Sequence, residues 1–277
     1  MRFGVHISAH ADGMDLRAFG RLLEERGGDA LYLPEHTHVP VTMASEHPGG
    51  PEAMGPSSRL LDPFVALGFV AAATDRLRLG TGVCLIPQRD PIVLAKEIAT
   101  LDVLSGGRAL LGIGAGWNRE EMANHGVDPK TRFAQMREQV LAIKRLWTDE
   151  EAEFHGDFVD FGPVRQQPKP RQTPHPPILV GGEGPGVLAR VAEYGDTWLP
   201  NAHPGLVERT RELQSLADER GRSPIPTIVF GAPWDRDAIA RYQDAGIAGC
   251  VFDIPYETPG TATAGLDRFA ELIAEFR

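Results

Sequence analysis

The sequence predicts an α/β protein and, among α/β folds, a (β/α)8 TIM barrel. Strand-like apolar runs alternate with amphipathic, helix-like runs along the whole chain. Eight such pairs occur within 277 residues, which is the usual size of one closed barrel. With 42% hydrophobic residues the chain can fill one large core, so residues 1–277 are expected to form a single domain. Alternation alone leaves a doubly wound open sheet as the alternative.

The elements follow one another in a regular order. Strands are predicted at 3–7, 30–33, 77–84, 109–113, 177–180, 197–199, 227–230 and 249–252. Helices are predicted at 16–26, 63–74, 92–104, 131–147, 186–194, 206–220, 235–245 and 266–276. Asp62-Pro63 and Asp90-Pro91 are favourable helix starts, because Asp caps the first turn and Pro tolerates its first position.

Two stretches interrupt this alternation. Residues 34–61 form a long loop after the second strand, and loops of such length in compact domains usually have a function. Residues 148–176 are an insertion after the fourth helix, in which 154–158 resembles a small hairpin and several prolines then keep the chain extended.

Composition excludes several classes of function. The net charge of −10 argues against nonspecific nucleic-acid binding, which needs a basic surface. The longest nearly apolar run, 64–73, is about half of the ~20 residues that span a bilayer, so no membrane segment is expected. Cys84 and Cys250 lie far apart and give neither a disulfide framework nor a metal-ligand spacing. Because no signal peptide is visible either, a cytoplasmic protein is expected.

The segment 180–186, VGGEGPG, is the most informative motif. It joins a predicted strand to a predicted helix, and its glycines allow close approach of a ligand to the backbone. Pro185 stands where we expect the helix to begin, and the free N–H groups of a first turn favour an anion. The motif therefore predicts a phosphate cradle, although an ordinary tight turn has the same composition.

Two further glycine-rich segments follow the third and fourth strands. The segment 112–118, GIGAGWN, is not a dinucleotide fingerprint, because Trp117 stands where the last glycine is needed. A flat ring lying against this backbone is favoured, and a glycine-rich strand exit that lets a barrel close is the simpler alternative. Gly80 and Gly82, within 79–83, indicate a strand bulge or a close approach to a ligand.

Histidines follow the second strand in the segment Glu35-His36-Thr37-His38. A histidine at the carboxyl end of a barrel strand is a catalytic candidate, because its ordinary pKa lies near neutrality. His36 and His38 also have the spacing of a metal pair, but the exits of the fifth, sixth and eighth strands offer no obvious further ligands. A histidine that only closes a loop hydrogen bond is a third interpretation.

Four segments together resemble the bacterial luciferase-like superfamily. They are LGTGVCLIPQRDPIVLAKEIATLDVLSGGRALLGIGAGW at 79–117, ALYLPEHTHVP at 30–40, PHPPILVGG at 174–182 and YGDTWLP at 194–200. The chain is most similar to the branch of luciferase-like oxidoreductases that use the deazaflavin coenzyme F420. The superfamily also holds FMN-dependent monooxygenases.

The resemblance implies a fold, a cofactor and an oligomer. It implies a (β/α)8 barrel with an insertion, commonly a homodimer, with the flavin-like ring over the carboxyl-terminal mouth of the barrel. It implies a non-prolyl cis peptide behind the ring, at Gly82–Val83 or Val83–Cys84.

The resemblance also implies roles for particular residues. The residues implied are Glu35 and His36 in catalysis; Gly82, Val83, Gly114, Ala115 and Gly116 along the ring; and Gly181, Gly182, Glu183 and Gly184 at the phosphate.

The chain departs from the family pattern at two places. In F420-dependent sugar-phosphate dehydrogenases an acidic residue follows the glycines of the fourth strand, and here Trp117 stands there. Glu183 beside a phosphate is electrostatically unfavourable unless its side chain turns away. Trp117, Met43 and Met54 are expected to form an apolar substrate wall.

The expected function is hydride transfer between coenzyme F420 and a small organic substrate, with His36 moving a proton. The alternatives are an FMN-dependent monooxygenase served by a separate reductase, a cofactor-binding protein without chemistry, and a metal-dependent barrel hydrolase. The last lacks a ligand set, so no metal site is expected.

Overall fold

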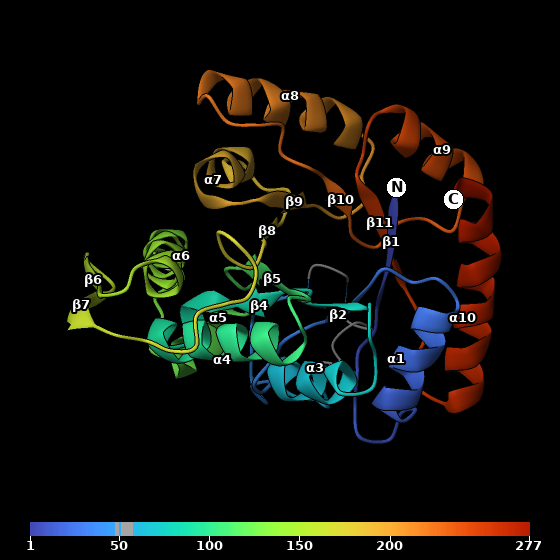
Figure 1. The fold of residues 1–277 in the computed structure, drawn as a ribbon, viewed down its shortest axis with the longest axis horizontal. Coiled ribbons are helices and arrows are strands. Elements are labelled where there is room, and N and C mark those ends of the chain that lie inside the picture. The colour runs from blue at the N-terminus through green and yellow to red at the C-terminus, as the bar shows by residue number, and fades with distance from the viewer. Residues whose placement is uncertain (48–49, 51–57) are drawn as a thin grey trace.

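The computed structural model of the chain is an eight-stranded parallel barrel surrounded by helices (Figure 1). It describes residues 1–47, 50 and 58–277. The barrel strands are β1 (Arg2–His6), β2 (Ala30–Leu33), β3 (Arg78–Thr81), β5 (Ala109–Gly114), β8 (Ile178–Gly181), β9 (Thr197–Leu199), β10 (Ile228–Val229) and β11 (Gly249–Asp253). Their hydrogen-bonded order is β10-β11-β1-β2-β3-β5-β8-β9.

The two ends of this order meet, so the sheet is closed rather than doubly wound. Parallel bridges join Trp198 of β9 to Thr227, and Asn201 to Phe230. Between them the amide of Phe230 donates to the carbonyl of Pro200 at 2.7 Å. The predicted barrel is thereby confirmed, and the carboxyl ends of all its strands point to one mouth.

The helices cover the outside of the barrel. They are α1 (Leu16–Glu25), α3 (Pro63–Ala71), α4 (Pro91–Leu104), α5 (Arg119–Asn124), α6 (Arg132–Thr148), α7 (Val187–Tyr194), α8 (Leu206–Glu219), α9 (Arg236–Asp244) and α10 (Pro259–Ile273), with short 3-10 turns η2 (Ile86–Gln88) and η3 (Ala274–Phe276). The two helix starts expected from Asp-Pro pairs are confirmed: the carboxylates of Asp62 and Asp90 accept the first free N–H groups of α3 and α4.

Two predicted elements differ from the structure, and one helix was not expected. The strand expected at 77–84 is broken after Thr81 and resumes as β4 (Cys84–Leu85), and the Gly82–Val83 peptide between the two pieces is cis. Helix α10 begins at Pro259 rather than at 266, since Thr258 and Thr261 form a reciprocal capping pair. The short helix α5, which follows β5, was not predicted.

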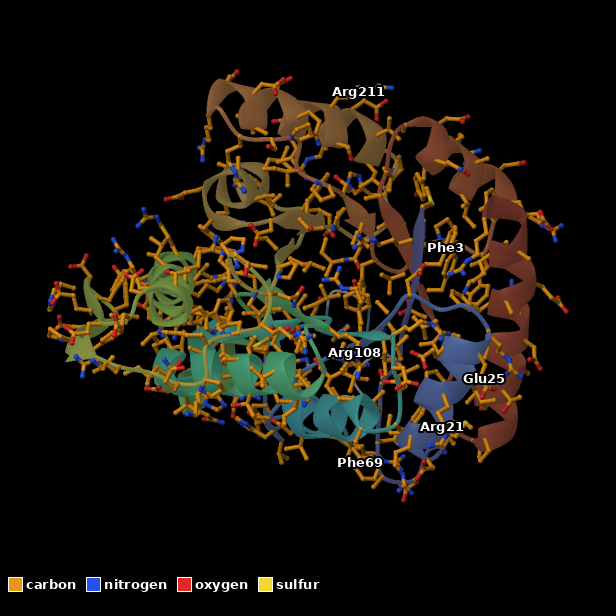
Figure 2. All side chains as sticks on the ribbon, in the orientation of Figure 1. Phe3, Arg21, Glu25, Phe69, Arg108 and Arg211 are labelled. Atoms are coloured by element: carbon orange, nitrogen blue, oxygen red, sulfur yellow. The ribbon has the colours of Figure 1, made fainter. Side chains whose placement is uncertain are left out.

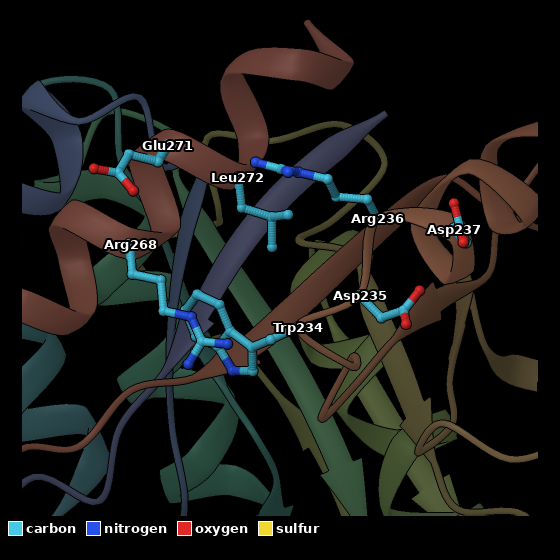
Figure 3. A pocket seen from close by; sticks show the side chains of 7 residues that line it. All are labelled: Trp234, Asp235, Arg236, Asp237, Arg268, Glu271 and Leu272. Atoms are coloured by element: carbon cyan, nitrogen blue, oxygen red, sulfur yellow. The ribbon is translucent and has the colours of Figure 1, made fainter.

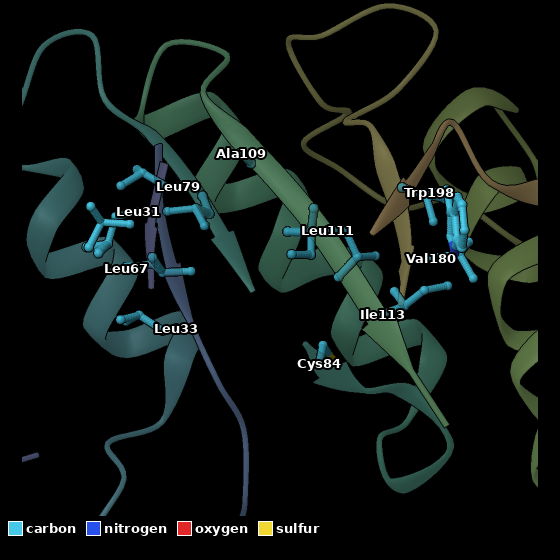
Figure 4. Packing of buried hydrophobic residues seen from close by; sticks show 14 of the residues in the cluster. Leu31, Leu33, Leu67, Leu79, Cys84, Ala109, Leu111, Ile113, Val180 and Trp198 are labelled. Atoms are coloured by element: carbon cyan, nitrogen blue, oxygen red, sulfur yellow. The ribbon is translucent and has the colours of Figure 1, made fainter. Parts of the chain in front are cut away.

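Alternation along the strands divides the buried side chains into two layers. Leu31, Leu79, Leu111 and Val180 face outward and pack beneath the helices (Figure 4). A second set fills the barrel interior, comprising Ala30, Tyr32, Leu110, Leu179, Leu199 and Val251. Gly80 makes room for the Tyr32 ring, because a Cβ at Gly80 would come within 2.7 Å of it.

The insertion leaves the barrel as a separate hairpin beside α6 (Figure 1). Its strands are β6 (Ala152–His155) and β7 (Asp160–Val164), so the hairpin expected around 154–158 is confirmed. Glu138 of α6 accepts the N–H groups of the turn, including that of Phe158 at 2.7 Å, and this holds the hairpin against the helix. No helix among the described residues is both long and apolar enough to cross a bilayer.

Arg108 closes the end of the barrel opposite the mouth (Figure 2). It directly precedes β5, and all five of its N–H groups have acceptors. These acceptors are the carbonyls of Ala71, Thr74, Leu77 and Ser105 and the hydroxyl of Thr74. One guanidinium thus satisfies the carbonyls where α3 ends and β3 begins.

Replacing Arg108 with Lys should lower the free energy of unfolding by roughly 2–3 kcal/mol, since an ammonium supplies three donors and leaves carbonyls unpaired. Chemical denaturation would measure this change. As a control, Arg211→Ala on the exposed face of α8 (Figure 2) should stay within about 0.5 kcal/mol of the wild type. Equal midpoints for Arg108→Lys and the wild type would contradict the anchoring role of Arg108.

Candidate active site at the barrel mouth

The carboxyl ends of four neighbouring strands bring most of the predicted site residues to one mouth. His36 follows β2, Val83 follows β3, Gly114 ends β5, and Gly181 ends β8. These strands are adjacent in the order β2-β3-β5-β8. Loops at this face of a barrel carry the functional groups while the strands hold them rigid.

His36 is held from both ring nitrogens. Its Nδ1 lies 2.7 Å from Oε2 of Glu121, and the indole N–H of Trp117 donates to its Nε2 at 3.3 Å. Because an indole nitrogen can only donate, the Nε2 of His36 is the acceptor and Nδ1 carries the hydrogen toward the carboxylate. The side chains are 8% exposed for His36 and 0% for Glu121, so water hardly competes for this pair. The arrangement presents an oriented imidazole suited to moving a proton.

Glu121 is a residue of the candidate site that the sequence analysis missed. It lies on α5, and its second oxygen accepts the backbone N–H of Thr37 at 3.1 Å. The helix begins because the side chain of Asn118 accepts the N–H of Glu121 at 3.0 Å. The signal was Asn118 three residues before Glu121, a capping pattern just after a strand. That spacing locates the helix but not its partner His36, which lies 85 residues away.

Trp117 is placed beside the predicted catalytic histidine and contacts the loop after β2. Its ring lies 5.6 Å from that of His36 and 4.9 Å from that of His47, both edge to face. Met43 reaches the same region, where Asn118 donates to its sulfur at 3.5 Å. The structure therefore brings Trp117 and Met43 near one another, whereas Met54 lies outside the described residues.

Glu35 faces away from this imidazole and binds the segment after the strand break. One of its oxygens accepts the N–H of Leu85 at 2.6 Å, and the other accepts Nε of Arg89 at 2.6 Å. Burial alone lowers the pKa of Arg89, but the bond to Glu35 outweighs this and holds it above its ordinary value. The geometry favours a positioning role for Glu35 over the catalytic one we expected, because both oxygens are engaged.

The strand break places Val83 on top of two glycines. The cis peptide lies at Gly82–Val83, the first of the two positions expected. A Cβ at Gly114 would come within 2.7 Å of the Val83 side chain, and one at Gly181 within 3.1 Å. A side chain at Gly114 would therefore clash with Val83 and one at Gly181 would be tightly placed, and Ala115 and Gly116 continue the edge of this floor beyond β5. An apolar floor bordered by bare backbone fits a flat ring.

The glycine-rich loop after β8 differs in one detail from the expectation. Helix α7 begins at Val187 after Gly186, so Pro185 precedes the helix instead of starting it. The backbone at Gly182 has φ = 103°, which favours glycine, and open space lies before the Cα atoms of Gly182 and Gly184. This cradle fits an anion at the start of α7.

The acidic side chain of the loop is turned aside. Oε1 of Glu183 accepts from the side-chain amide of Asn201 at 2.9 Å, at the end of β9. Arg209 of α8 donates to the backbone carbonyl of Glu183. A specific hydrogen bond therefore holds the Glu183 carboxylate on Asn201.

The two histidines with metal-pair spacing have separate partners. His36 binds Glu121, whereas His38 contacts Thr37 and Asn124 at 2.9 Å each. Within the part of the chain that the structure describes, no three His, Cys, Asp or Glu side chains gather as a metal site would require. The geometry gives the metal-hydrolase alternative no support.

A separate hollow lies on the outer wall of the barrel (Figure 3). Its wall is made by Trp234, Asp235, Arg236, Asp237, Arg268, Glu271 and Leu272. The guanidinium of Arg268 stacks on Trp234 at 4.5 Å, and Arg236 pairs with Glu275 at 2.7 Å. Because both arginines have partners and no lining residue stands at a strand end named above, we do not assign the candidate site to this hollow.

Comparisons with known proteins identify the family and the fold. A family model described as luciferase-like monooxygenase matches residues 1–246. An uncharacterized protein of Mycobacterium tuberculosis is 39% identical over 280 residues, covering 99% of both chains. The F420-dependent glucose-6-phosphate dehydrogenase of Kineococcus radiotolerans is 34% identical over 79% of this chain and 68% of its own. The crystal structure of monooxygenase RslO1 from Streptomyces bottropensis superposes with a TM-score of 0.81 at 23% identity, covering 100% of both chains.

The contact between Trp117 and His47 predicts a measurable titration. Burial, and then the nearby His36, hold the pKa of His47 below its ordinary value, because both disfavour the imidazolium. Trp117→Ala exposes the His47 ring, so its pKa should rise toward the ordinary value. NMR titration of the histidine ring protons would show this. His155 is an internal reference, since its hydrogen bond to Asp160 raises its pKa in both proteins. An unmoved His47 pKa would mean that Trp117 does not cover it.

Proposed function

Because the chain belongs to the luciferase-like monooxygenase family, we propose that it is an oxidoreductase that passes a hydride between coenzyme F420 and a small organic substrate. The relative that supports this choice of cofactor is an F420-dependent dehydrogenase, 34% identical over 245 residues. The site supplies an oriented histidine, an apolar floor and an anion cradle around one barrel mouth.

The residues at the mouth fit the cofactor in two parts. Val83 would lie beneath the ring, with Gly82 behind it and Gly114, Ala115 and Gly116 along its edge. Gly181, Gly182, Glu183 and Gly184 would hold the phosphate through backbone N–H groups, with the Glu183 carboxylate turned to Asn201. When bound, F420 supplies a two-electron hydride donor or acceptor at C5 of its deazaflavin ring. The protein contributes orientation and exclusion of water.

The observation that carries the proposal is the buried His36–Glu121 pair beside Trp117. Hydride transfer to or from a carbon that bears oxygen requires a proton to move at that oxygen. His36 Nε2 faces Trp117 and exchanges this hydrogen bond for one with the substrate, while Glu121 stabilises the imidazolium that results. Glu35 acts indirectly by fixing the segment that carries Val83. Trp117 and Met43 form the apolar wall for the substrate.

A second candidate function is favoured by the monooxygenase description of the family and by a solved neighbour, a Baeyer-Villiger monooxygenase in complex with FMN. An FMN-dependent monooxygenase that obtains reduced flavin from a separate reductase would use the same floor and cradle. In that case the proton-handling pair would serve the substrate or an oxygen-derived leaving group.

We further propose that the enzyme works in the cytoplasm as a homodimer.

A binding titration of the apo-protein against F420 and FMN tests the choice between them. We expect quenching of Trp fluorescence by F420 at lower concentration than by FMN. Tight binding of FMN with none of F420 would replace the first proposal by the second. Stoichiometric zinc or manganese in the purified protein, with neither cofactor bound, would restore the metal alternative.

Replacing His36 with Ala should lower kcat by roughly 10²–10⁴-fold, the usual contribution of a positioned acid or base, and leave the Kd for the cofactor nearly unchanged. Glu121→Gln should give a smaller loss, because the amide can still accept from Nδ1 but carries no charge. His38→Ala, in the same loop, is the matched control. An unchanged turnover in His36→Ala with an identified substrate would refute the catalytic role.

A further inference from the structure

A second histidine–carboxylate pair stands at the barrel mouth, on the strand next to β2. His6 ends β1 and Asp253 ends β11, and the two residues are direct partners in the parallel register of these strands (Figure 1). The Nδ1 atom of His6 lies 2.7 Å from Oδ1 of Asp253. Because the carboxyl ends of all barrel strands meet at one mouth, this His6–Asp253 dyad lies at the same mouth as His36.

The other ring nitrogen of His6 is buried and unpaired. Within residues 1–47, 50 and 58–277, which the structure describes, no donor or acceptor reaches its Nε2 atom. The Nε2 atom of His36, by contrast, accepts from Trp117. His155 forms a similar pair with Asp160 on the hairpin, but its side chain is 63% exposed and water can bind there. A buried polar atom without a partner costs stability, so Nε2 of His6 calls for a ligand.

The ring of Phe230 connects the dyad to the proposed ring floor. Phe230 follows β10, and its ring lies 4.8 Å from that of His6. The same ring approaches Gly82, where a Cβ would come within 2.8 Å of it. Like Val83, Phe230 is half-buried and packs on the side chains that fill the barrel interior. The apolar floor of the mouth therefore continues from Val83 across Phe230 to His6, and a small molecule lying on it borders the dyad.

The carboxylate of the dyad decides what His6 can bind. An ionised Asp253 only accepts hydrogen bonds, so the hydrogen of the neutral imidazole is placed on Nδ1 and Nε2 is left as an acceptor. An acceptor of this kind pairs with an O–H or N–H group and not with a carbonyl or carboxylate oxygen. Asp253 is 63% exposed, whereas His6 is 16% exposed, so the carboxylate stays solvated while it orients the ring.

We propose that the His6–Asp253 dyad is a second substrate subsite, which accepts a hydrogen bond from a hydroxyl group that the substrate carries besides the oxygen at its reacting carbon. This inference rests on the proposed function and names its substrate class as diols and hydroxyketones. His36 would meet the reacting oxygen and His6 the second one. The hydroxyl is assigned to the substrate rather than to the cofactor because β2 separates β1 from β3, and the proposed ring position on Val83 follows β3.

NMR of the histidine rings in the whole protein tests this subsite. The probes are cyclohexanol and its vicinal diol, which share a carbon skeleton and differ by one hydroxyl group. The diol should shift the Nε2 resonance of His6 and bind roughly tenfold more tightly than cyclohexanol, the size of one hydrogen bond. F420 alone should leave this resonance in place. The ring of His155 should respond to none of the three.

His6→Phe should keep an aromatic ring against Phe230 and abolish the preference for the diol. The same variant assigns the His6 resonance. His155→Phe is the matched control, because it removes a histidine paired with a carboxylate at 2.6 Å on the hairpin, and it should keep the preference. If His6→Phe does not fold, Asp253→Ala at an exposed position frees the ring and should weaken the preference. Asp253→Asn should restore most of it, since the amide oxygen still accepts from Nδ1.

Three results would overturn the subsite: equal affinity of the wild type for both probes, a His6 ring that responds to neither, or an unchanged diol preference in His6→Phe. A shift of the His6 resonance with F420 alone would assign the dyad to the cofactor and overturn it as well. The probes are measured without cofactor, so a failure of F420 to bind would overturn the proposed function separately and leave the diol result standing.

Discussion

One buried carboxylate holds the mouth of this barrel together. Glu35 follows β2 and binds both the amide of Leu85 and the guanidinium of Arg89, so it joins the second strand to the segment beyond the break in the third. Arg89 extends the connection to Asp62 and Glu97, at the start of α3 and within α4. Because His36 is the next residue and Val83 lies two residues before Leu85, the same ion pair fixes the proton-handling group and the proposed ring floor relative to each other. A buried charge of this kind is tolerable only when every oxygen has a partner, as here.

The proposed cofactor surface is made largely of backbone. A Cβ at Gly114 would clash with the Val83 side chain, and one at Gly181 would make a tight contact with it. The barrel interior below is filled by Tyr32 and its neighbours. The ionisable side chains of the candidate site, His36 and Glu121, stand at one side of this surface. This arrangement would keep the low-dielectric floor apart from the proposed proton-handling pair.

The sequence predicted what is local or periodic. Strand and helix periods located the barrel, and Asp-Pro pairs located two helix starts. The glycines around Val83 indicated the strand break. What it did not predict depends on contacts between distant segments: Glu121 meets His36 across 85 residues, and Glu35 meets Arg89 across 54. At Pro185 a local expectation was wrong. The sequence favoured a helix start at Pro185, but Gly186 caps the helix and α7 begins at Val187. Periodicity reports which face of an element is apolar, and it carries no information about which polar side chains converge after folding.

The buried thiol of Cys84 is a natural probe of local unfolding at the barrel mouth. Cys84 begins β4 beside the Glu35 carboxylate and is 0% exposed, and burial raises the pKa of its thiol well above the ordinary value. Figure 4 shows the thiol among the packed side chains of the core. A thiol reagent can reach it only when β4 leaves the barrel, and the thiol must then ionise. The rate at which Cys84 is alkylated in the native protein therefore reports how readily the segment that carries the proposed ring floor opens locally.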